Sequence, residues 1–323
     1  MMTSNACEKW SEAIMSVSET IQNEFKSKIQ GEVLFQESMA RHSTIQVGGP
    51  VDIWIEPKDE NDCKVAQELA QLHDLSFMTV GRGSNLVVRD GGIRGVVVHV
   101  GDAFQTVTIH EQKNDTYIID VGAGMMMKQL LSWTADQALT GIEGLEGVPG
   151  TVGGAVAMNA GTPHGAIGDA VVSVTWLEKA KLVTRQAEKL EFAYRKAKIP
   201  RAATVLSVRI KLEKSDGAAV LGKLQELRRY RQSKQPLQQP SMGSVFKNPD
   251  KTNTAGKLIE EAGLKGVRVG KAQISPQHAN WIVNLGGATA NDVEVLIRLA
   301  KDTVKEKTGY ILEPEVKIIG EHS

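Results

Sequence analysis

The sequence predicts an α+β protein with two domains. Its 323 residues are about twice the length of an average domain of roughly 150 residues. Between Val51 and Leu212, short β-branched runs outnumber the stretches with helical periodicity. After Leu212 the pattern changes to a charged helix and then to a connection rich in proline and glutamine at residues 235–240, beyond which helix and strand patterns alternate. We therefore expect a domain boundary near residue 212.

The N-terminal segment, residues 1–40, is expected to be helical and to pack on the body of the protein. Residues 8–30 place Trp10, Ile14, Ile21 and Phe25 on one face of a helix, with polar residues between them. The first domain then spans residues 41–212 and the second spans residues 213–323.

Each domain has a recognisable order of elements. In the first, the patterns predict strands at 51–55, 77–80, 96–98, within 107–121, 171–177 and 205–212, with helices at 61–72 and 127–138. In the second, they predict helices at 218–233, 255–262 and 291–307 and strands at 281–285 and 315–319. Thr289 followed by Asp292 is a capping box for the last helix.

Composition excludes several classes of protein. The chain has 38 Lys and Arg against 38 Asp and Glu, so no basic field attracts nucleic acid or an anionic membrane surface. Cys7 and Cys63 lie far apart, which indicates reduced thiols, and the seven histidines form no metal-binding pattern. Because no segment approaches the roughly 18 apolar residues of a membrane span, we expect a cytoplasmic protein without a metal.

Two clusters of glycine stand out. The first begins directly after the strand at 77–80, in the loop 81–86, with the sequence Gly-Arg-Gly-Ser-Asn-Leu. Such a loop can aim several backbone N–H groups at one phosphate. Leu86 replaces the third glycine of a Rossmann fingerprint, and no Gly-Lys-Ser/Thr follows, so neither that motif nor a P-loop is present. A tight turn without a ligand is the alternative.

The second cluster lies within residues 141–168, which contain 9 glycines in 28 residues. Its centre, residues 147–161, is apolar as well as rich in glycine, which is unusual for a surface loop. One interpretation is a core crossing where two backbones pass closely. The other is a wall on which a flat, bulky ligand and its phosphates lie against the backbone.

Six motifs together resemble the UDP-N-acetylenolpyruvoylglucosamine reductase family. In chain order they are His42-Ser43-Thr44 with Gly48-Gly49-Pro50, the Gly81 loop, the Pro149 loop, Tyr194-Arg195, Gly243-Ser244-Val245-Phe246-Lys247-Asn248-Pro249, and Glu313-Pro314-Glu315-Val316. The resemblance implies an FAD-binding domain of the PCMH/vanillyl-alcohol-oxidase type in two α+β lobes, followed by a smaller α+β substrate-binding domain. Because residues 212–241 are few, it also implies the compact subclass that lacks an additional substrate-closing loop.

The resemblance further implies that both glycine loops hold FAD, with NADPH as the reductant. FAD is expected to be bound non-covalently, since residues 82–85 contain no histidine to tether it. The residues assigned to the cofactor on this basis are Val80, Gly81, Arg82, Gly83, Ser84, Asn85, Leu86, Gly147, Val148, Pro149, Gly150, Thr151, Gly153, Gly154, Ala155, Asn159 and Gly161.

The family reaction implies roles for three further residues. Hydride addition to an enolpyruvyl ether places negative charge on the α-carbon and its carboxylate, which calls for a cation and a proton donor. By motif position Ser244 matches the proton donor, Arg195 the group that binds the carboxylate, and Glu315 the carboxylate that assists. Taken singly, each has a structural alternative: a turn serine, an exposed arginine and a solvated glutamate.

Substrate binding is assigned to Tyr194, Lys247 and Asn248, so the expected partner is a nucleotide sugar, and the sequence leaves the oligomeric state open. Two positions depart from the family pattern: Ala197 replaces a hydroxyl residue, and Glu146 replaces a small residue close to the expected flavin site. These departures motivate two alternatives, a paralogous FAD-dependent oxidoreductase with another substrate and a catalytically idle flavin-binding protein.

Overall fold

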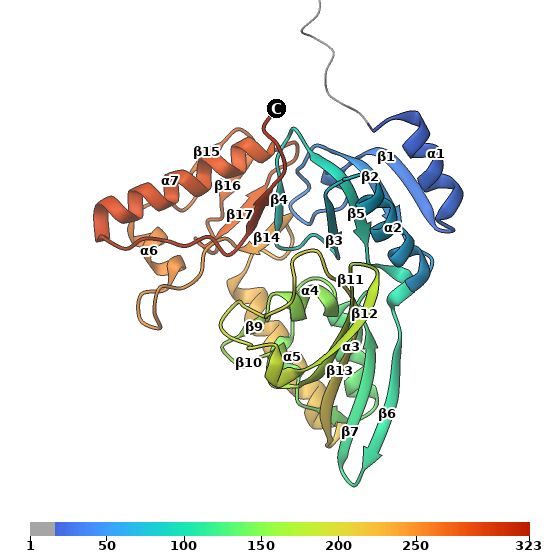
Figure 1. Ribbon diagram of the computed structural model, residues 1–323. Coiled ribbons are helices and arrows are strands. Elements are labelled where there is room, and N and C mark those ends of the chain that lie inside the picture. Colours follow the sequence, from blue (N-terminus) through green and yellow to red (C-terminus); the bar gives the residue numbers. More distant parts are fainter. Residues whose placement is uncertain (1–16) are drawn as a thin grey trace, which may run out of the picture.

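A computed structural model describes residues 17–323, which form three parts that meet at one junction (Figure 1). The first lobe is built on a sheet of order β1-β2-β5-β3, in which β2, β5 and β3 run parallel and β1 is antiparallel to β2. Its elements are α1 (Glu19–Lys28), β1 (Glu32–Ser38), β2 (Pro50–Glu56), α2 (Glu60–Leu72), β3 (Phe77–Val80), β4 (Leu86–Val88) and β5 (Ile93–His99).

The second lobe is an antiparallel sheet of order β12-β11-β13-β7-β6, from which the β6–β7 hairpin extends away from the rest of the molecule (Figure 1). Its elements are β6 (Val107–Lys113), β7 (Thr116–Gly122), α3 (Met127–Asp136), β8 (Leu139–Thr140), α4 (Val152–Ala157), β9 (Gly161–Thr162), β10 (Gly165–Ala166), β11 (Val171–Glu178), β12 (Lys181–Gln186), β13 (Thr204–Lys214) and α5 (Gly217–Lys234).

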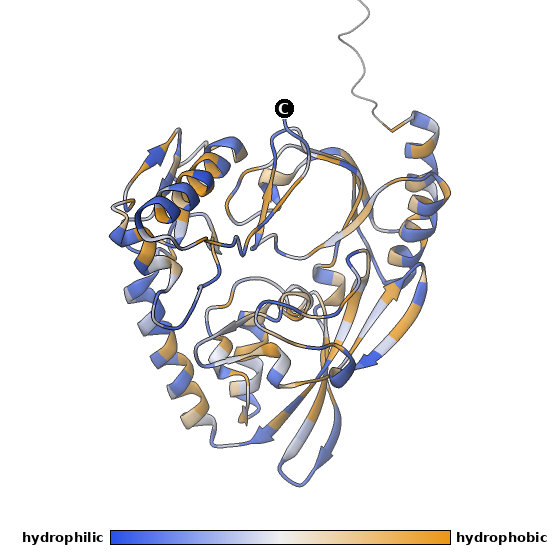
Figure 2. Cartoon of the chain, turned by 60° about the vertical axis from the view of Figure 1, so that its left-hand side comes forward, coloured by the Kyte–Doolittle hydropathy of each residue, from blue (hydrophilic) through white to orange (hydrophobic). Residues whose placement is uncertain are grey.

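The C-terminal part packs helices on a small sheet of order β14-β17-β16-β15. Its elements are β14 (Ser241–Ser244), α6 (Ala255–Glu261), β15 (Arg268–Val269), β16 (Ala272–Ile274), β17 (Trp281–Asn284), α7 (Ala290–Thr308) and β18 (Lys317–Ile319). Hydrophobic and hydrophilic residues alternate along α7, as expected for a helix with one buried face (Figure 2). The capping box of Thr289 and Asp292 is confirmed.

The hydrophobic cores do not coincide with the two domains predicted from the sequence. One large core unites both lobes, and α5 contributes Val220 and Leu224 to it. A second core belongs to the C-terminal part but also receives Ile45, Val47 and Val87 from the first lobe. The boundary that the sequence predicts at residue 212 therefore lies before a helix that packs on the second lobe.

The α+β prediction is confirmed, and the predicted elements are present with shifts of a few residues at their ends. The N-terminal helix spans only Glu19–Lys28 within the described residues, and Trp10 and Ile14 lie outside them. The prediction missed β1, whose side chains are mostly half-buried rather than alternating. It also extended the last strand too far, because β18 begins at Lys317, after Pro314 and Glu315.

A polar contact joins the first lobe to the C-terminal part. The carboxylate of Asp90 accepts hydrogen bonds from the backbone N–H groups of Ala290 and Asn291, at 2.9 and 3.0 Å, and so caps the first turn of α7. Beside it, Arg89 pairs with Glu294 at 2.9 Å. In the same region β18 returns to the first lobe and pairs parallel with β4.

We expect Asp90→Ala to lower the free energy of unfolding by about 1–2 kcal/mol, because α7 loses its capping carboxylate and two N–H groups lose their acceptor. Urea unfolding followed by circular dichroism measures the change. The matched control is Asp136→Ala at the exposed end of α3, which should change the midpoint little. Equal destabilisation by both variants would contradict a specific role for Asp90.

Candidate functional site

The two glycine loops lie against each other. A Cβ at Gly81 would stand 2.4 Å from the hydroxyl oxygen of Thr151, and a Cβ at Gly150 would stand 2.7 Å from the hydroxyl oxygen of Ser84. The Ser84 hydroxyl also donates to the carbonyl of Pro149 at 3.2 Å. The two glycine loops, which lie some 65 residues apart in the chain, thus form two sides of one candidate binding site. Glycine permits their close backbone approach there.

The loop 81–86 offers backbone donors. Among the hydrogen bonds of residues 17–323, none is donated by the backbone N–H of Arg82, Gly83, Ser84 or Asn85. Gly83 adopts a left-handed φ of 64°, and the Arg82 side chain is exposed. Consecutive N–H groups left without a protein acceptor are typical of a loop that binds an anion such as a phosphate.

The second glycine loop, residues 147–161, does not offer a similar set of free backbone donors, because its central N–H groups already donate to protein carbonyls. Thr151 caps the short helix α4, while the N–H groups of Val152 and Gly153 donate to the carbonyls of Met125 and Ala123. Val152, Ala155 and other apolar side chains of α4 are buried, and Gly147, Pro149 and Gly154 are exposed. Gly161 packs closely on its own hairpin partner, Ala166. This loop supplies an apolar wall more than a set of donors.

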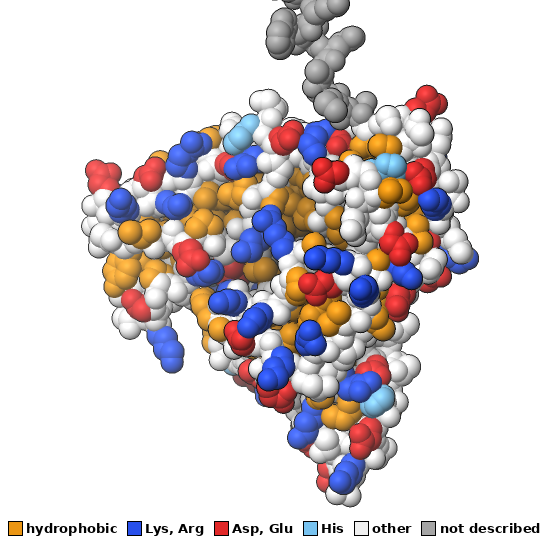
Figure 3. All heavy atoms as spheres, in the orientation of Figure 1, with side chains coloured by type: hydrophobic (Ala, Val, Ile, Leu, Met, Phe, Trp, Pro, Cys, Tyr) orange, Lys and Arg blue, Asp and Glu red, His pale blue; other side chains and the backbone are white. Residues whose placement is uncertain are grey.

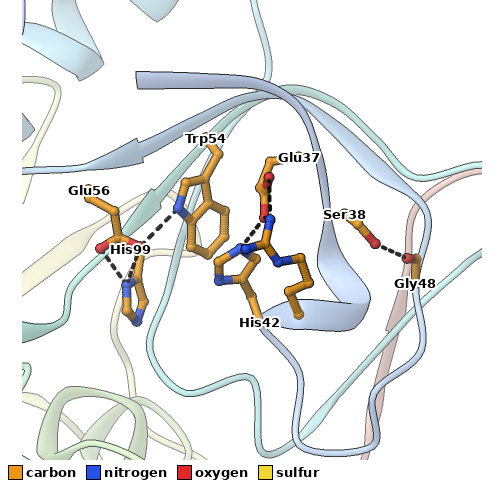
Figure 4. Close-up of polar contacts among 8 residues, drawn as sticks. Glu37, Ser38, His42, Gly48, Trp54, Glu56 and His99 are labelled. Carbon is orange, nitrogen blue, oxygen red and sulfur yellow. Dashed lines mark hydrogen bonds and ion pairs between the residues drawn. The ribbon is translucent and has the colours of Figure 1, made fainter. Parts of the chain in front are cut away.

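An aromatic cluster that the sequence analysis did not single out supports the first loop (Figure 4). The His42 ring stacks on buried Trp54 with 3.9 Å between centroids, and His99 stacks on Trp54 at 5.4 Å. Glu56 accepts a hydrogen bond from the Trp54 indole and pairs with His99 at 2.7 Å. The cluster touches the loop, since a Cβ at Gly83 would stand 2.3 Å from the His42 carbonyl oxygen.

Sequence signals for this cluster were partial. His42 belongs to the first family motif, and Trp54 lies in the alternating strand pattern of residues 51–55. His99 had no signal, because its contact depends on β5 lying between β2 and β3, where it stands opposite Val80.

All three parts of the molecule meet at Asn85. Its side-chain amide donates to the backbone carbonyl of Glu315 at 3.2 Å and lies 3.7 Å from the sulfur of Met158. Its backbone carbonyl accepts from the N–H of Lys317 at 2.9 Å. The amide of Asn85 is therefore engaged by the segment that carries Glu315.

The structure brings Arg195 and Glu315 together across the junction. The Arg195 Nε lies 2.6 Å from the Glu315 Oε1, and both side chains are largely buried, at 17% and 13% exposure. The pair is an ion pair, but Nε is not aligned for a hydrogen bond. Arg195 itself has a left-handed φ of 56°, which costs a residue with a side chain about 1–2 kcal/mol. Backbone strain of this kind is typical of functional sites.

Burial raises the pKa of Glu315 above its usual value, although the charge of Arg195 acts in the opposite direction. Two residues away, the exposed Glu313 pairs with the Lys247 ammonium, which lowers the pKa of Glu313. The two glutamates do not share one environment, although both lie in the irregular segment before β18, which begins at Lys317. Only Glu315 faces Arg195.

Ser244 is the last residue of β14, and the loop that it begins, residues 244–249 (the Ser244 loop), pairs with the Glu315 segment. The N–H of Glu315 donates to the carbonyl of Val245 at 2.8 Å, one residue after Ser244. On the other side, the buried side chain of Asn280 accepts from the N–H of Phe246 at 2.9 Å and donates to its carbonyl at 2.8 Å. The Ser244 hydroxyl makes no hydrogen bond among the described residues and is partly exposed.

The three residues assigned to substrate binding lie next to these groups. The hydroxyl of Tyr194 accepts a hydrogen bond from the N–H of Asn248 at 3.4 Å, and the Arg195 guanidinium lies 5.1 Å from the Tyr194 ring centre. Lys247 follows Ser244 by three residues and is half-buried. Tyr194 is 57% exposed, so its ring faces open space at the edge of the junction.

Glu146, one of the two departures from the family pattern, is buried and ion-paired. Arg228 of α5 approaches its carboxylate with two nitrogens, at 2.8 and 3.3 Å, and Arg231 donates to its backbone carbonyl at 3.0 Å. The side chain of Arg231 also lies against Gly147. Glu146 thus attaches the second glycine loop to α5. The other departure, Ala197, leaves no hydroxyl two residues after Arg195. The charged partner of Arg195 in the structure is Glu315.

The surface around the junction suits an anionic ligand with an apolar part. Figure 3 shows hydrophobic side chains in the hollow where the three parts meet and Lys and Arg side chains around it. Cys63 lies elsewhere, buried, where desolvation raises the pKa of its thiol to about 12. In residues 17–323, no cluster of His, Cys, Asp or Glu could hold a metal ion, and no helix could span a membrane.

Comparison with known proteins decides the family. Residues 51–184 match the family model of an FAD binding domain, and residues 235–319 match that of the C-terminal domain of UDP-N-acetylenolpyruvoylglucosamine reductase. The chain is 39% identical over 306 residues to the UDP-N-acetylenolpyruvoylglucosamine reductase of Anoxybacillus flavithermus, covering 94% of this chain and 99% of the relative. The chain belongs to the UDP-N-acetylenolpyruvoylglucosamine reductase family.

Further comparisons agree. The UDP-N-acetylenolpyruvoylglucosamine reductase of Exiguobacterium sibiricum is 41% identical over 293 residues, covering 90% of this chain and 94% of the relative. The crystal structure of the Thermus caldophilus reductase superposes with a TM-score of 0.77 at 36% identity, covering 90% of this chain and 99% of that one. The predicted fold type, an FAD-binding domain in two lobes followed by a smaller domain, is confirmed.

The residues of the two glycine loops fit FAD. A loop with unpaired N–H groups suits the pyrophosphate, and positions where a Cβ would collide with the opposite loop explain why glycine is needed there. The individual cofactor contacts assigned from the sequence remain predictions.

We expect Gly81→Ala to weaken FAD binding by about 5- to 150-fold, because relieving the overlap with Thr151 forces the loops apart at a cost of about 1–3 kcal/mol. The ratio of flavin to protein absorbance after dialysis measures the loss. Gly222→Ala in α5, where a Cβ would meet nothing within 4 Å, is the matched control. Full flavin retention in Gly81→Ala would contradict the assigned role of this loop.

Proposed function

We propose that this protein reduces UDP-N-acetylglucosamine enolpyruvate to UDP-N-acetylmuramate with NADPH, using non-covalently bound FAD. The observation that carries the proposal is the assembly of Arg195, Glu315 and the Ser244 loop at the junction beside the glycine loops. These are the groups that addition of hydride to an enolpyruvyl ether requires. The family relationship supports the same reaction.

FAD held by the two glycine loops would supply hydride, taken from NADPH, for the β-carbon of the enolpyruvyl group. Arg195 binds the substrate carboxylate and stabilises the negative charge that develops on it, a task for which a planar guanidinium with several donors is suited. Its left-handed backbone conformation and its pairing with Glu315 fix the direction of the guanidinium.

Ser244 donates the proton that completes the addition at the α-carbon. Its hydroxyl has no protein partner among the described residues and is therefore available to substrate. The loop that carries it is held on two sides, by Asn280 and by the segment of Glu315. A fixed donor next to a basic carbon is an efficient general acid even when its solution pKa is high.

Glu315 in its ionised form balances the charge of Arg195 and holds it in place. The nucleotide part of the substrate extends toward Tyr194, Lys247 and Asn248, where a phosphate would bind the ammonium of Lys247 in competition with the exposed Glu313. The exposed Tyr194 ring provides a surface for stacking or packing.

We place the activity in the cytoplasm, in the synthesis of peptidoglycan precursors, and hence upstream of cell shape and division. Two alternatives remain as outcomes of the test: another substrate for the same chemistry, and an idle flavin-binding protein. Neither is favoured by the relatives, and the Arg195–Glu315 pair argues against the second.

Separate measurement of the two half-reactions tests the function. We expect NADPH to bleach the flavin of the wild type and of Ser244→Ala at similar rates. Reoxidation by UDP-N-acetylglucosamine enolpyruvate should be slower in Ser244→Ala by about 100-fold or more, because the proton donor is lost. Ser132→Ala, at an exposed position of α3, is the control. If the wild-type reduced flavin were not reoxidised by this substrate, the proposed function would be wrong.

The pH dependence of reoxidation tests Glu315. Because its pKa is raised, protonation should break the pair with Arg195 at a higher pH than for an ordinary glutamate, so the rate should fall as pH drops through that pKa. We expect Glu315→Gln to react slowly and to lack this acid limb. Glu313→Gln, whose glutamate has a lowered pKa, should keep it. An unchanged limb in Glu315→Gln would assign it to another group.

A further inference from the structure

We propose that Asn159 is a positioning residue for Arg195, which it holds through the backbone of the Ala193–Lys196 turn. The inference rests on the role of Arg195 in the proposed function. It departs from the sequence-based expectation that Asn159 contacts the cofactor.

The turn that carries Arg195 is short and strained. The N–H and carbonyl of Ala193 each bond to Lys196, at 3.0 Å in both directions, which leaves Tyr194 and Arg195 at the tip. The second tip position of such a turn is left-handed and usually taken by glycine, but here it is Arg195, with φ of 56°. A bulky residue persists in this conformation only when its surroundings hold the turn in place.

Asn159 supplies that support from the second lobe. Its side-chain amide nitrogen donates to the carbonyl of Ala193 at 2.8 Å, and its side-chain oxygen accepts from the N–H of Gly168 at 3.0 Å. The residue is 7% exposed. A buried carboxamide with both ends bonded to backbone fixes two segments relative to each other.

Gly168 shows how closely these segments fit. A Cβ at this glycine would stand 2.7 Å from the Phe192 ring and 2.8 Å from the Asn159 side-chain oxygen. Phe192 lies directly before the turn. Gly168 therefore packs against the Phe192 ring while Asn159, to which Gly168 is bonded, holds the carbonyl of Ala193. The contacts account for how the turn is aimed at Glu315, which lies in another part of the molecule.

Two substitutions separate the hydrogen bonds from backbone strain. Asn159 has a left-handed φ of 44°, so Asn159→Gly removes the carboxamide and keeps that conformation favourable. Asn159→Asp keeps the size and the acceptor for Gly168 but places a carboxylate oxygen against the Ala193 carbonyl. The matched control is Asn114→Gly in the exposed β6–β7 turn, where φ is 53°.

We expect both Asn159 variants to retain FAD and to be reduced by NADPH at the wild-type rate. Reoxidation by UDP-N-acetylglucosamine enolpyruvate should be slower by about tenfold or more, the effect of one lost hydrogen bond on a transition state. A loosened Arg195 stabilises the Glu315 carboxylate less, so the pKa of Glu315 should rise further, while the charge of Lys247 continues to lower that pKa as in the wild type. The acid limb of reoxidation should therefore move to higher pH. Asn114→Gly should behave as the wild type.

Comparison with Arg195→Ala shows whether Asn159 acts through Arg195 or through a contact with the cofactor. If Asn159 acts through Arg195, Asn159→Gly should slow reoxidation in the wild type but add little in the Arg195→Ala background. Loss of FAD or slower reduction by NADPH in Asn159→Gly would show a cofactor contact and overturn the proposal. Normal reoxidation in Asn159→Gly, with Arg195→Ala slow, would overturn it and leave the proposed function intact. Normal reoxidation in Arg195→Ala would instead remove Arg195 from the proposed function.

Discussion

The ion pair between Arg195 and Glu315 is the contact on which the site depends. Its two residues come from different parts of the molecule and are mostly buried, so bulk water stabilises either charge only weakly. Removing one partner of a buried pair commonly costs about 3–5 kcal/mol, more than the pair itself contributes. The two parts must therefore close on each other in one arrangement, which is also the arrangement that brings the Ser244 loop beside the glycine loops.

Asparagine side chains hold the segments that carry the three candidate catalytic residues by hydrogen bonds to the backbone. Asn85 bonds the carbonyl of Glu315 and Asn280 bonds Phe246 beside Ser244, as Asn159 bonds the turn of Arg195. A carboxamide offers a donor and an acceptor without adding charge. The electrostatics of the site are thus left to Arg195, Glu315 and Lys247, while neutral groups set the geometry.

Sequence could predict those features that depend on local pattern or on motif. A candidate anion-binding loop could be predicted after β3 because its glycines directly follow that strand, and Arg195, Ser244 and Glu315 could be predicted as candidate site residues from the family motifs. The contrast between Glu313 and Glu315 was not predictable, since it depends on the tertiary contacts that bury Glu315 against Arg195 and leave Glu313 exposed beside Lys247. Nor were the bond from Asn85 to Glu315, which spans 230 residues, and the packing of α5 on the second lobe, because both require the tertiary fold.

A double-mutant cycle on Arg195 and Glu315 tests most directly whether these residues act as one unit across the junction. The quantity to measure is the rate at which UDP-N-acetylglucosamine enolpyruvate reoxidises the reduced flavin in the wild type, Arg195→Ala, Glu315→Gln and the double variant. The account predicts that the double variant is slowed far less than the product of the two single effects. Effects that simply multiply would show that the two residues act independently and would contradict it.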